Sequence, residues 1–117
     1  MQLLPEIKAI THTAPDAVAL SLYVQPALHY FPNHFPDFPI LPGVVQLNWA
    51  VHFAREHLAM TGKFSALENI KFQSIVLPQQ ALELSLKWHA PQQRLEFVFA
   101  LGAQKFSSGR IIFGGAA

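Results

Sequence analysis

Prolines surround one histidine that could transfer a proton. His34 lies in a segment with prolines at positions 26, 32, 36, 39 and 42. Each proline fixes its own φ angle and biases the preceding residue towards extended geometry, so we expect a stiff loop rather than a helix or a central strand. An unperturbed imidazole titrates near pH ~6.5 and can accept or give a proton at neutral pH. His34 is therefore a candidate for acid–base chemistry; the alternative is a histidine that only packs and hydrogen-bonds in the loop.

A glycine follows at the expected start of a helix. Residues 43–60 contain no proline, and Gly62 is a plausible stop. Apolar residues recur there at three- and four-residue steps, which predicts one apolar helix face: Val44, Leu47, Val51, Ala54 and Leu58. The first N–H groups of a helix have no partner within it and carry the positive end of its dipole. The N–H of Gly43 can therefore stabilise an oxygen that becomes negative, and the missing side chain also allows a tight turn into the helix.

The remaining residues mostly alternate between apolar and polar, which is typical of half-buried strands. Strands are expected at 17–24, 68–77, 82–88, 95–101 and 104–113, and more weakly at 3–12. Residues 90–93 read as a hairpin turn. The expected order is two strands, the proline loop, the helix and then four strands in a meander. This order favours an α+β fold in which the helix covers one face of an antiparallel sheet.

Length and composition narrow the class of protein. The 117 residues form one expected domain, 1–117, with 51% apolar and only 13% charged residues. This composition excludes disorder and suggests that part of the surface forms a subunit interface. The net charge of +1, without a basic run, argues against binding to a nucleic-acid phosphate backbone.

The residues and motifs that the sequence lacks argue against a disulfide-bonded, metal-binding, cofactor-binding or membrane protein. It has no cysteine, its histidines are scattered, and it has no glycine motif for phosphates or dinucleotides. We therefore expect no disulfide, no metal and no cofactor. No apolar run approaches the roughly 20 residues of a membrane helix, and the first residues do not resemble a signal peptide. The expectation is a cytoplasmic protein without a membrane segment.

Residues 30–50 carry a more specific motif. His34-Phe35-Pro36 is followed by Pro39-Ile40-Leu41-Pro42-Gly43-Val44. In the types and the spacing of these residues the chain resembles the 3-hydroxyacyl-acyl-carrier-protein dehydratases, a hotdog-fold family. Residues 69–72 and 76–78 resemble that family's strand after the helix, so the resemblance covers nearly the whole chain. The residue types at positions 41–47 are most similar to those of the branch of this family found in aryl polyene biosynthesis.

The resemblance implies a fold, an assembly and a reaction. The fold would be an antiparallel sheet wrapped around one long central helix, in a homodimer or a higher assembly of dimers with sites at the interface. The reaction would be reversible dehydration of a 3-hydroxyacyl thioester, on acyl carrier protein or coenzyme A, to the trans-2-enoyl thioester, with no cofactor. His34 matches the general base that removes the α proton. The N–H of Gly43 matches the donor to the thioester oxygen.

Asn48 departs from the family's pattern. The dehydratases have Glu or Asp at this position, and that carboxyl, supplied by the partner subunit, helps to protonate the departing hydroxyl. An amide can hold a hydroxyl or a water but cannot supply a proton at neutral pH. Three alternatives are open: His34 returns the proton itself, His52 or Asp37 takes the acid role, or the protein is not a competent dehydratase.

Two rival functions remain beside dehydration. One is a hotdog acyl thioesterase, which would release free acid and thiol. The other is a non-catalytic subunit that binds an acyl group or a carrier protein, as half of a heterodimer whose partner supplies the missing acid. A basic patch would suit an acidic carrier, and an even spread of solvated charge is an equal alternative; its candidates are Lys63, Lys71, Arg94, Lys105 and Arg110.

Overall fold

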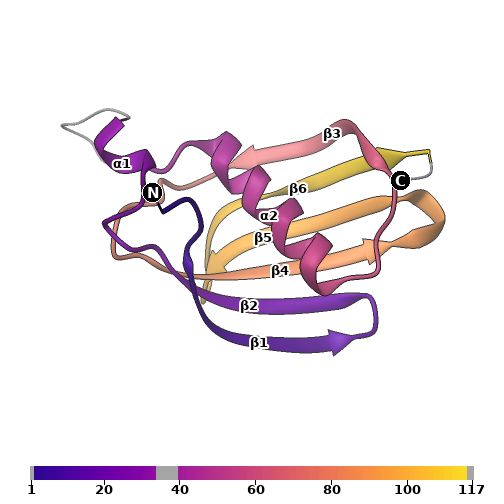
Figure 1. The fold of residues 1–117 in the computed structure, drawn as a ribbon, viewed down its shortest axis with the longest axis horizontal. Helices are drawn as coiled ribbons and strands as arrows, with labels where there is room; N and C mark the ends of the chain where they lie inside the picture. Colours follow the sequence, from indigo (N-terminus) through magenta and orange to yellow (C-terminus); the bar gives the residue numbers. More distant parts are fainter. Residues whose placement is uncertain (1, 34–39, 116–117) are drawn as a thin grey trace.

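One long helix lies across one face of a six-stranded antiparallel sheet (Figure 1). The computed structural model describes residues 2–33 and 40–115. The strands are β1 (Glu6–Ala14), β2 (Ala17–Tyr23), β3 (Lys63–Phe72), β4 (Ala81–His89), β5 (Arg94–Leu101) and β6 (Gln104–Gly114). The helices are α1 (Tyr30–Asn33), α2 (Gly43–His57) and the short 3₁₀ helix η1 (Ala90–Gln92). The expected α+β class with an antiparallel sheet is confirmed.

The order of strands in the sheet is β1-β2-β4-β5-β6-β3. Only β4, β5 and β6 form a meander, so the expectation of four meandering strands is wrong for the first of them. β3 pairs with β6 and forms an edge of the sheet, and the chain then crosses over to β4. β1 forms the opposite edge.

The expected strand at 68–77 is also shifted. β3 begins at Lys63 and ends at Phe72. The N–H groups of Gln73 and Ser74 still donate to the Phe106 carbonyl of β6, at 2.9 and 3.3 Å. Beyond them the chain leaves the sheet: Leu41 N–H donates to the Val76 carbonyl at 2.9 Å, and Gln79 N–H donates to the Val24 carbonyl at 2.7 Å. The segment after β3 therefore lies beside the residues that lead into α2.

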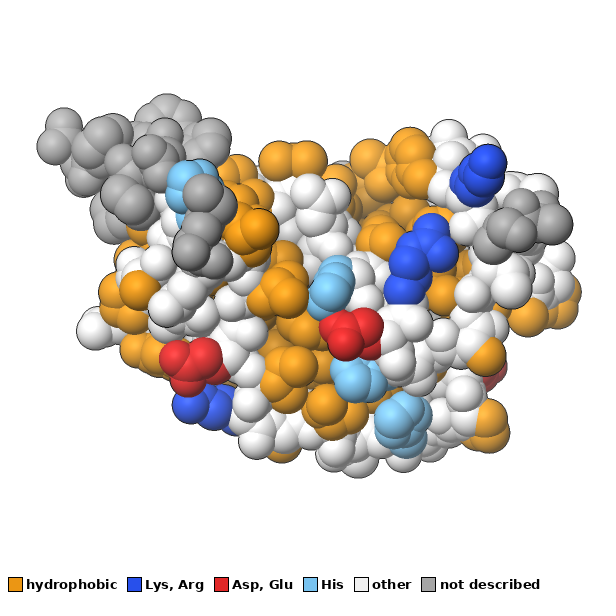
Figure 2. Space-filling model, in the orientation of Figure 1, with side chains coloured by type: hydrophobic (Ala, Val, Ile, Leu, Met, Phe, Trp, Pro, Cys, Tyr) orange, Lys and Arg blue, Asp and Glu red, His pale blue; other side chains and the backbone are white. Residues whose placement is uncertain are grey.

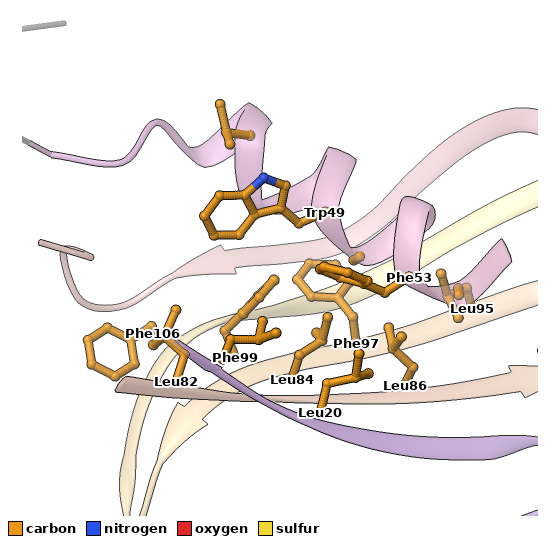
Figure 3. Packing of buried hydrophobic residues seen from close by; sticks show 14 of the residues in the cluster. Leu20, Trp49, Phe53, Leu82, Leu84, Leu86, Leu95, Phe97, Phe99 and Phe106 are labelled. Atoms are coloured by element: carbon orange, nitrogen blue, oxygen red, sulfur yellow. The ribbon is translucent and has the colours of Figure 1, made fainter. Parts of the chain in front are cut away.

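Large apolar side chains fill the space between α2 and the sheet. Trp49 and Phe53 point from the helix towards Leu84, Phe97 and Phe99 (Figure 3). All five are at most 1% exposed. Burying a side chain of this kind contributes about 1.5–3 kcal/mol relative to leaving it exposed, so this layer fixes α2 on the sheet.

The buried face of α2 differs from the predicted one. The side that enters the core carries Val45, Gln46, Trp49, Ala50, Phe53 and Ala54. Of the predicted stripe, Ala54 and Leu58 are buried, whereas Leu47 and Val51 are partly buried and Val44 is 62% exposed. The helix therefore has a second apolar side, which faces β3 rather than the core.

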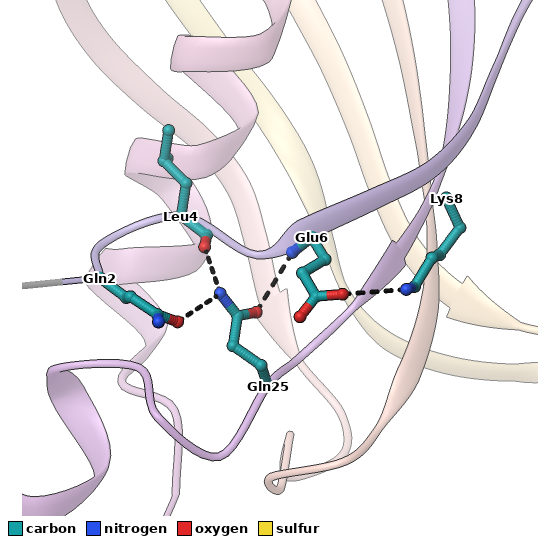
Figure 4. A network of polar contacts seen from close by, with 5 residues as sticks. All are labelled: Gln2, Leu4, Glu6, Lys8 and Gln25. Carbon is teal, nitrogen blue, oxygen red and sulfur yellow. Dashed lines mark hydrogen bonds and ion pairs between the residues drawn. The ribbon is translucent and has the colours of Figure 1, made fainter.

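The proline-rich segment contains one turn of helix, α1, where no helix was expected. Before it, the buried side chain of Gln25 holds the N-terminal residues in place (Figure 4). Its Nε2 donates to Gln2 Oε1 at 3.1 Å and to the Leu4 carbonyl at 2.9 Å, and its Oε1 accepts from Glu6 N–H at 3.1 Å. Within the described ranges, no helix is both long and apolar enough to cross a membrane.

Candidate active site

Helix α2 begins at Gly43 without a side-chain cap. The preceding Pro42 is extended, with φ −61° and ψ 145°, and its carbonyl accepts from the N–H groups of Val45 and Gln46. No acidic residue stands in the first turn. The N–H of Gly43 has no acceptor within the helix and lies at the positive end of the helix dipole.

A mostly apolar hollow of about 430 Å³ opens beside Gly43. The residues that line it are Ile40, Leu41, Gly43, Val44, Gln46, Phe72, Ser74, Ile75 and Val76. The ring of Phe72 lies against Gly43, since a Cβ added there would come within 2.6 Å of the Phe72 Cζ atom. A glycine is therefore needed for this close approach. The hollow offers an N–H donor at one end of an apolar wall, which suits a carbonyl attached to an acyl chain.

Asn48 lies outside this hollow. It is exposed on α2, five residues after Gly43 and therefore about 140° around the helix. It lines a groove of about 230 Å³ between α2 and β3, together with Val44, Leu47, Val51, Phe64, Leu67 and Ile111. It also lines a hollow of about 420 Å³ with Leu3, Leu4, Tyr30, Trp49 and His52. Val44 is the residue common to the Gly43 hollow and the Asn48 groove.

Two residues of the predicted site cannot be placed. His34, the predicted base, and Asp37, one of the alternative acids, lie outside the described residues. The pairing of His34 with Gly43 therefore remains a prediction.

His52 lies beside Asn48 in the hollow on the outer side of α2. Its Nε2 is in ion-pair contact with Glu56 one turn further on. Both side chains are exposed, so this contact adds little to stability. In the described part of the chain, no three of the His, Asp and Glu side chains are grouped so that they could hold a metal ion.

Sequence reasoning missed a buried polar pair next to Gly43. Ser107 Oγ donates to Gln46 Oε1 at 2.6 Å, and the two residues are 0% and 3% exposed. A polar residue three positions after the helix-start glycine, on the core side of α2, was the available signal.

The β3 edge of the sheet is unusually apolar for an exposed strand. Phe64 is 61% exposed, Leu67 44% and Phe72 53%. Val44 and Ile75 extend this surface beside the strand. Figure 2 shows hydrophobic side chains along the edge at the top of the view, where Figure 1 places β3. We call these five residues the β3 edge surface. It accounts for part of the low charge content of the sequence.

An antiparallel sheet of this order around one long helix defines the hotdog fold, which the dehydratase structure described below shares. Residues 10–110 match the ApeI-like family, whose description is ApeI dehydratase. The chain therefore belongs to the ApeI-like dehydratase family, and the resemblance seen in the sequence is confirmed.

Solved structures agree with this assignment. The structure described as the dehydratase heterocomplex ApeI:P from Xenorhabdus doucetiae has a TM-score of 0.89 and 33% identity, covering 95% of this chain and 98% of that chain. An uncharacterised protein from Erwinia carotovora subsp. atroseptica has a TM-score of 0.85 and 39% identity, covering 95% of this chain and 96% of that chain.

Curated relatives match over a shorter region. The 3-hydroxyacyl-[acyl-carrier-protein] dehydratase FabZ of Erythrobacter litoralis is 35% identical over 75 residues, 56% of this chain and 50% of that protein. The FabZ of Ruminiclostridium cellulolyticum is 32% identical over 62 residues, 47% of this chain and 44% of that protein. The chain thus spans about half the length of the curated relatives it matches.

Proposed function

We propose that this protein dehydrates a 3-hydroxyacyl thioester, carried on an acyl carrier protein, to the trans-2-enoyl thioester in fatty-acid or polyene biosynthesis. The observation that carries the proposal is the place of Gly43 at the first position of α2, where its N–H has no acceptor within the helix, beside a mostly apolar hollow of about 430 Å³. The membership in the ApeI-like dehydratase family supports the same reaction.

The reaction needs a base, an oxygen-binding donor and an acid. His34 would take the proton from the α carbon. The electron pair of the broken carbon–hydrogen bond forms the new double bond, while the bond from the β carbon to the hydroxyl breaks. The hydroxyl leaves with a proton as water. While the α proton departs, the thioester oxygen becomes more negative, and the N–H of Gly43 would stabilise it. Donors of this kind typically contribute about 10²–10³ in rate.

The mechanism also needs a group that assists the departing hydroxyl on the β carbon. Asn48 is exposed and does not line the Gly43 hollow of its own chain. Val44 joins its groove to that hollow at the β3 edge surface. In a homodimer joined along β3, the Asn48 side chain of one protomer would therefore approach the Gly43 hollow of the other. There the amide would hold the departing hydroxyl while His34 returns the proton.

Several basic residues lie close enough together to form a contact surface for an acidic carrier protein. Lys71, Lys105 and Arg110 line a hollow of about 310 Å³ on the outer side of the sheet, together with Asn69 and Glu96. Three of the five basic candidates thus gather in one place. This grouping supports an acidic carrier as the source of the acyl group, since opposite charges speed encounter.

A second function is favoured by Asn48 itself. The related ApeI:P structure is described as a dehydratase heterocomplex. By analogy, this chain would pair with a different hotdog subunit that supplies the acid, and would bind the acyl group without completing the reaction alone.

One assay separates these functions. Purified protein is incubated with 3-hydroxyacyl thioesters of several chain lengths, and the products are separated by mass spectrometry. Dehydration predicts an enoyl thioester from wild type and none from His34→Ala. Free acid would favour a thioesterase. No turnover by wild type at any chain length would reject the homodimeric enzyme in favour of the binding subunit.

A further inference from the structure

The one deeply buried glutamine on α2 has no packing reason to be polar. Gln46 is 3% exposed among apolar side chains such as Val45, Trp49 and Ala50. Burying an amide costs free energy unless its polar atoms are hydrogen-bonded, and an apolar side chain of similar size would fill the space without that cost. A polar residue at this position therefore suggests a use for its donor or acceptor atoms.

The acceptor atom is already used. Gln46 Oε1 accepts a 2.6 Å hydrogen bond from Ser107 Oγ, which is 0% exposed on β6. In the structure the amide oxygen faces Ser107, which leaves the NH₂ group on the other side of the amide. Ser107 is itself held in register between Phe72 of β3 and Phe99 of β5. The sheet thus sets the orientation of the amide on the helix.

The donor atom remains available. Over residues 2–33 and 40–115, no hydrogen bond joins Gln46 Nε2 to another residue, and the side chain lines the hollow beside Gly43. Gln46 follows Gly43 by three residues, so the two lie on the same side of the helix. Side chains on a helix lean towards its N-terminus, which brings the amide towards the first turn. The hollow therefore has two N–H donors on an otherwise mostly apolar wall.

We infer that Gln46 Nε2 is a second hydrogen-bond donor to the carbonyl oxygen of the bound acyl thioester, beside the N–H of Gly43, and that Ser107 is the positioning residue that directs it. This inference rests on the proposed function for the identity of the ligand, an acyl thioester. No bond is made or broken by Gln46. Its N–H strengthens the hold on the oxygen as negative charge develops there.

Two ligands isolate this contact. The first is an acyl-pantetheine amide, in which nitrogen replaces the thioester sulfur and the carbonyl is kept. The second is the matching alkyl-pantetheine thioether, in which a methylene replaces the carbonyl. Their affinities are measured by isothermal titration calorimetry. Gln46→Met keeps the length of the side chain and removes its N–H. It should weaken binding of the amide by roughly 2–10-fold and leave the thioether unchanged.

The double variant separates the donor role from a structural one. Gln46→Met alone leaves the Ser107 hydroxyl buried without a partner, which lowers the unfolding temperature. Gln46→Met/Ser107→Ala replaces both partners by apolar groups, and such exchanges can be nearly neutral for stability. The double variant should regain stability but not affinity for the amide. Ser107→Ala alone should weaken the amide less than Gln46→Met, because the donor is kept and only its orientation is lost.

A matched control is the other buried glutamine. Gln25→Met removes an amide that is 9% exposed, binds the N-terminal residues and does not line the Gly43 hollow. It should change stability without changing the ratio of the two affinities.

The inference is overturned if wild type does not prefer the amide over the thioether, or if Gln46→Met weakens both ligands equally. Failure of the proposed function looks different: no enoyl product forms, yet the loss specific to the carbonyl persists. In an active enzyme, Gln46→Met should lower kcat/KM by about 10²–10³-fold, as loss of an oxyanion donor does elsewhere.

Discussion

The ring of Phe72 lies over Gly43 so closely that a Cβ on residue 43 would stand 2.6 Å from Cζ and 2.8 Å from Cε1. Phe72 is 53% exposed, at the end of edge strand β3, so its ring can swing outwards. The contact therefore lies at the surface beside the first residue of α2 and not in the core. It couples the first residue of α2 to the β3 edge surface, where a second subunit is proposed.

Gly43→Ala should reduce activity far more than stability. Its backbone is not in the left-handed region, so alanine is tolerated, and the displaced ring is the far end of a side chain. The new methyl group occupies the space through which a carbonyl reaches the N–H. We expect kcat/KM to fall by about 10²–10³-fold, with little change in the thermal unfolding midpoint.

The control for this variant is Gly114→Ala. An added Cβ there meets only Ser65 at 3.9 Å, an ordinary contact. It should leave both quantities unchanged. If Gly43→Ala/Phe72→Ala regains the lost activity, the displaced ring, and not the blocked N–H, is the cause.

Asn48→Asp should raise the rate of dehydration. It restores a carboxyl where the dehydratases have one, and a positioned acid typically contributes about 10²–10⁴-fold. Asn48 is exposed on α2, so the exchange should not alter the fold. The measurement is steady-state turnover of a 3-hydroxyacyl thioester.

His52→Gln is the companion variant, because His52 shares a hollow with Asn48. A loss of activity in His52→Gln, together with no gain in Asn48→Asp, would assign the acid role to His52. No change in either variant would leave His34 as the group that returns the proton.

Strict alternation made parts of the fold predictable. Burial along β4 switches at nearly every residue, and the strand occupies Ala81–His89 around the predicted 82–88. β5 occupies Arg94–Leu101 around the predicted 95–101 for the same reason. In β3 nearly every residue is exposed, so no alternation marks its ends, and its prediction was shifted. The apolar and polar residues of an exposed edge strand do not alternate with burial, so its sequence pattern does not show where the strand begins and ends.

The candidate site was predictable only where it is local. The Pro42-Gly43 step correctly indicated the start of α2. The face of α2 that enters the core was predicted wrongly, because α2 has two apolar sides and the stripe that begins at Val44 faces β3. The contact between Gln46 and Ser107 joins residues 61 positions apart and depends on β6 lying beside β3. No periodicity in the sequence reveals that neighbour.

The β3 edge surface should hold the homodimer together. Exposed apolar edges invite pairing with another strand. Introducing a charge with Phe64→Lys or Leu67→Lys should therefore shift the mass in solution from two copies of the 13.0 kDa chain to one. Sedimentation velocity over a range of concentrations measures this. Activity should be lost with the dimer, because the site would take Asn48 from the neighbour.

The opposite edge provides the control for this dimer. Ile7 and Ile10 of β1 are 42% and 41% exposed, similar to Leu67 at 44%. Ile7→Lys and Ile10→Lys should leave the mass unchanged. A monomeric wild type, or dissociation caused by the β1 variants instead, would contradict a dimer formed through β3.

Gln25→Leu should loosen the N-terminal residues without unfolding the sheet. Gln25 makes three hydrogen bonds that tie Gln2, Leu4 and Glu6 to the chain after β2. Leucine leaves the Leu4 carbonyl and the Glu6 N–H without these partners, and we expect a loss of about 1–3 kcal/mol in the free energy of unfolding. Urea denaturation measures the loss, and amide hydrogen exchange should show faster exchange at Glu6. Gln80→Leu is the comparison, since its exposed amide bonds, among the residues that the structure describes, only to the carbonyl of the next residue. It should change stability by less than about 0.5 kcal/mol. Equal effects of the two variants would mean that the N-terminal residues are held by Trp49, whose Nε1 donates to the Leu3 carbonyl at 2.9 Å, rather than by Gln25.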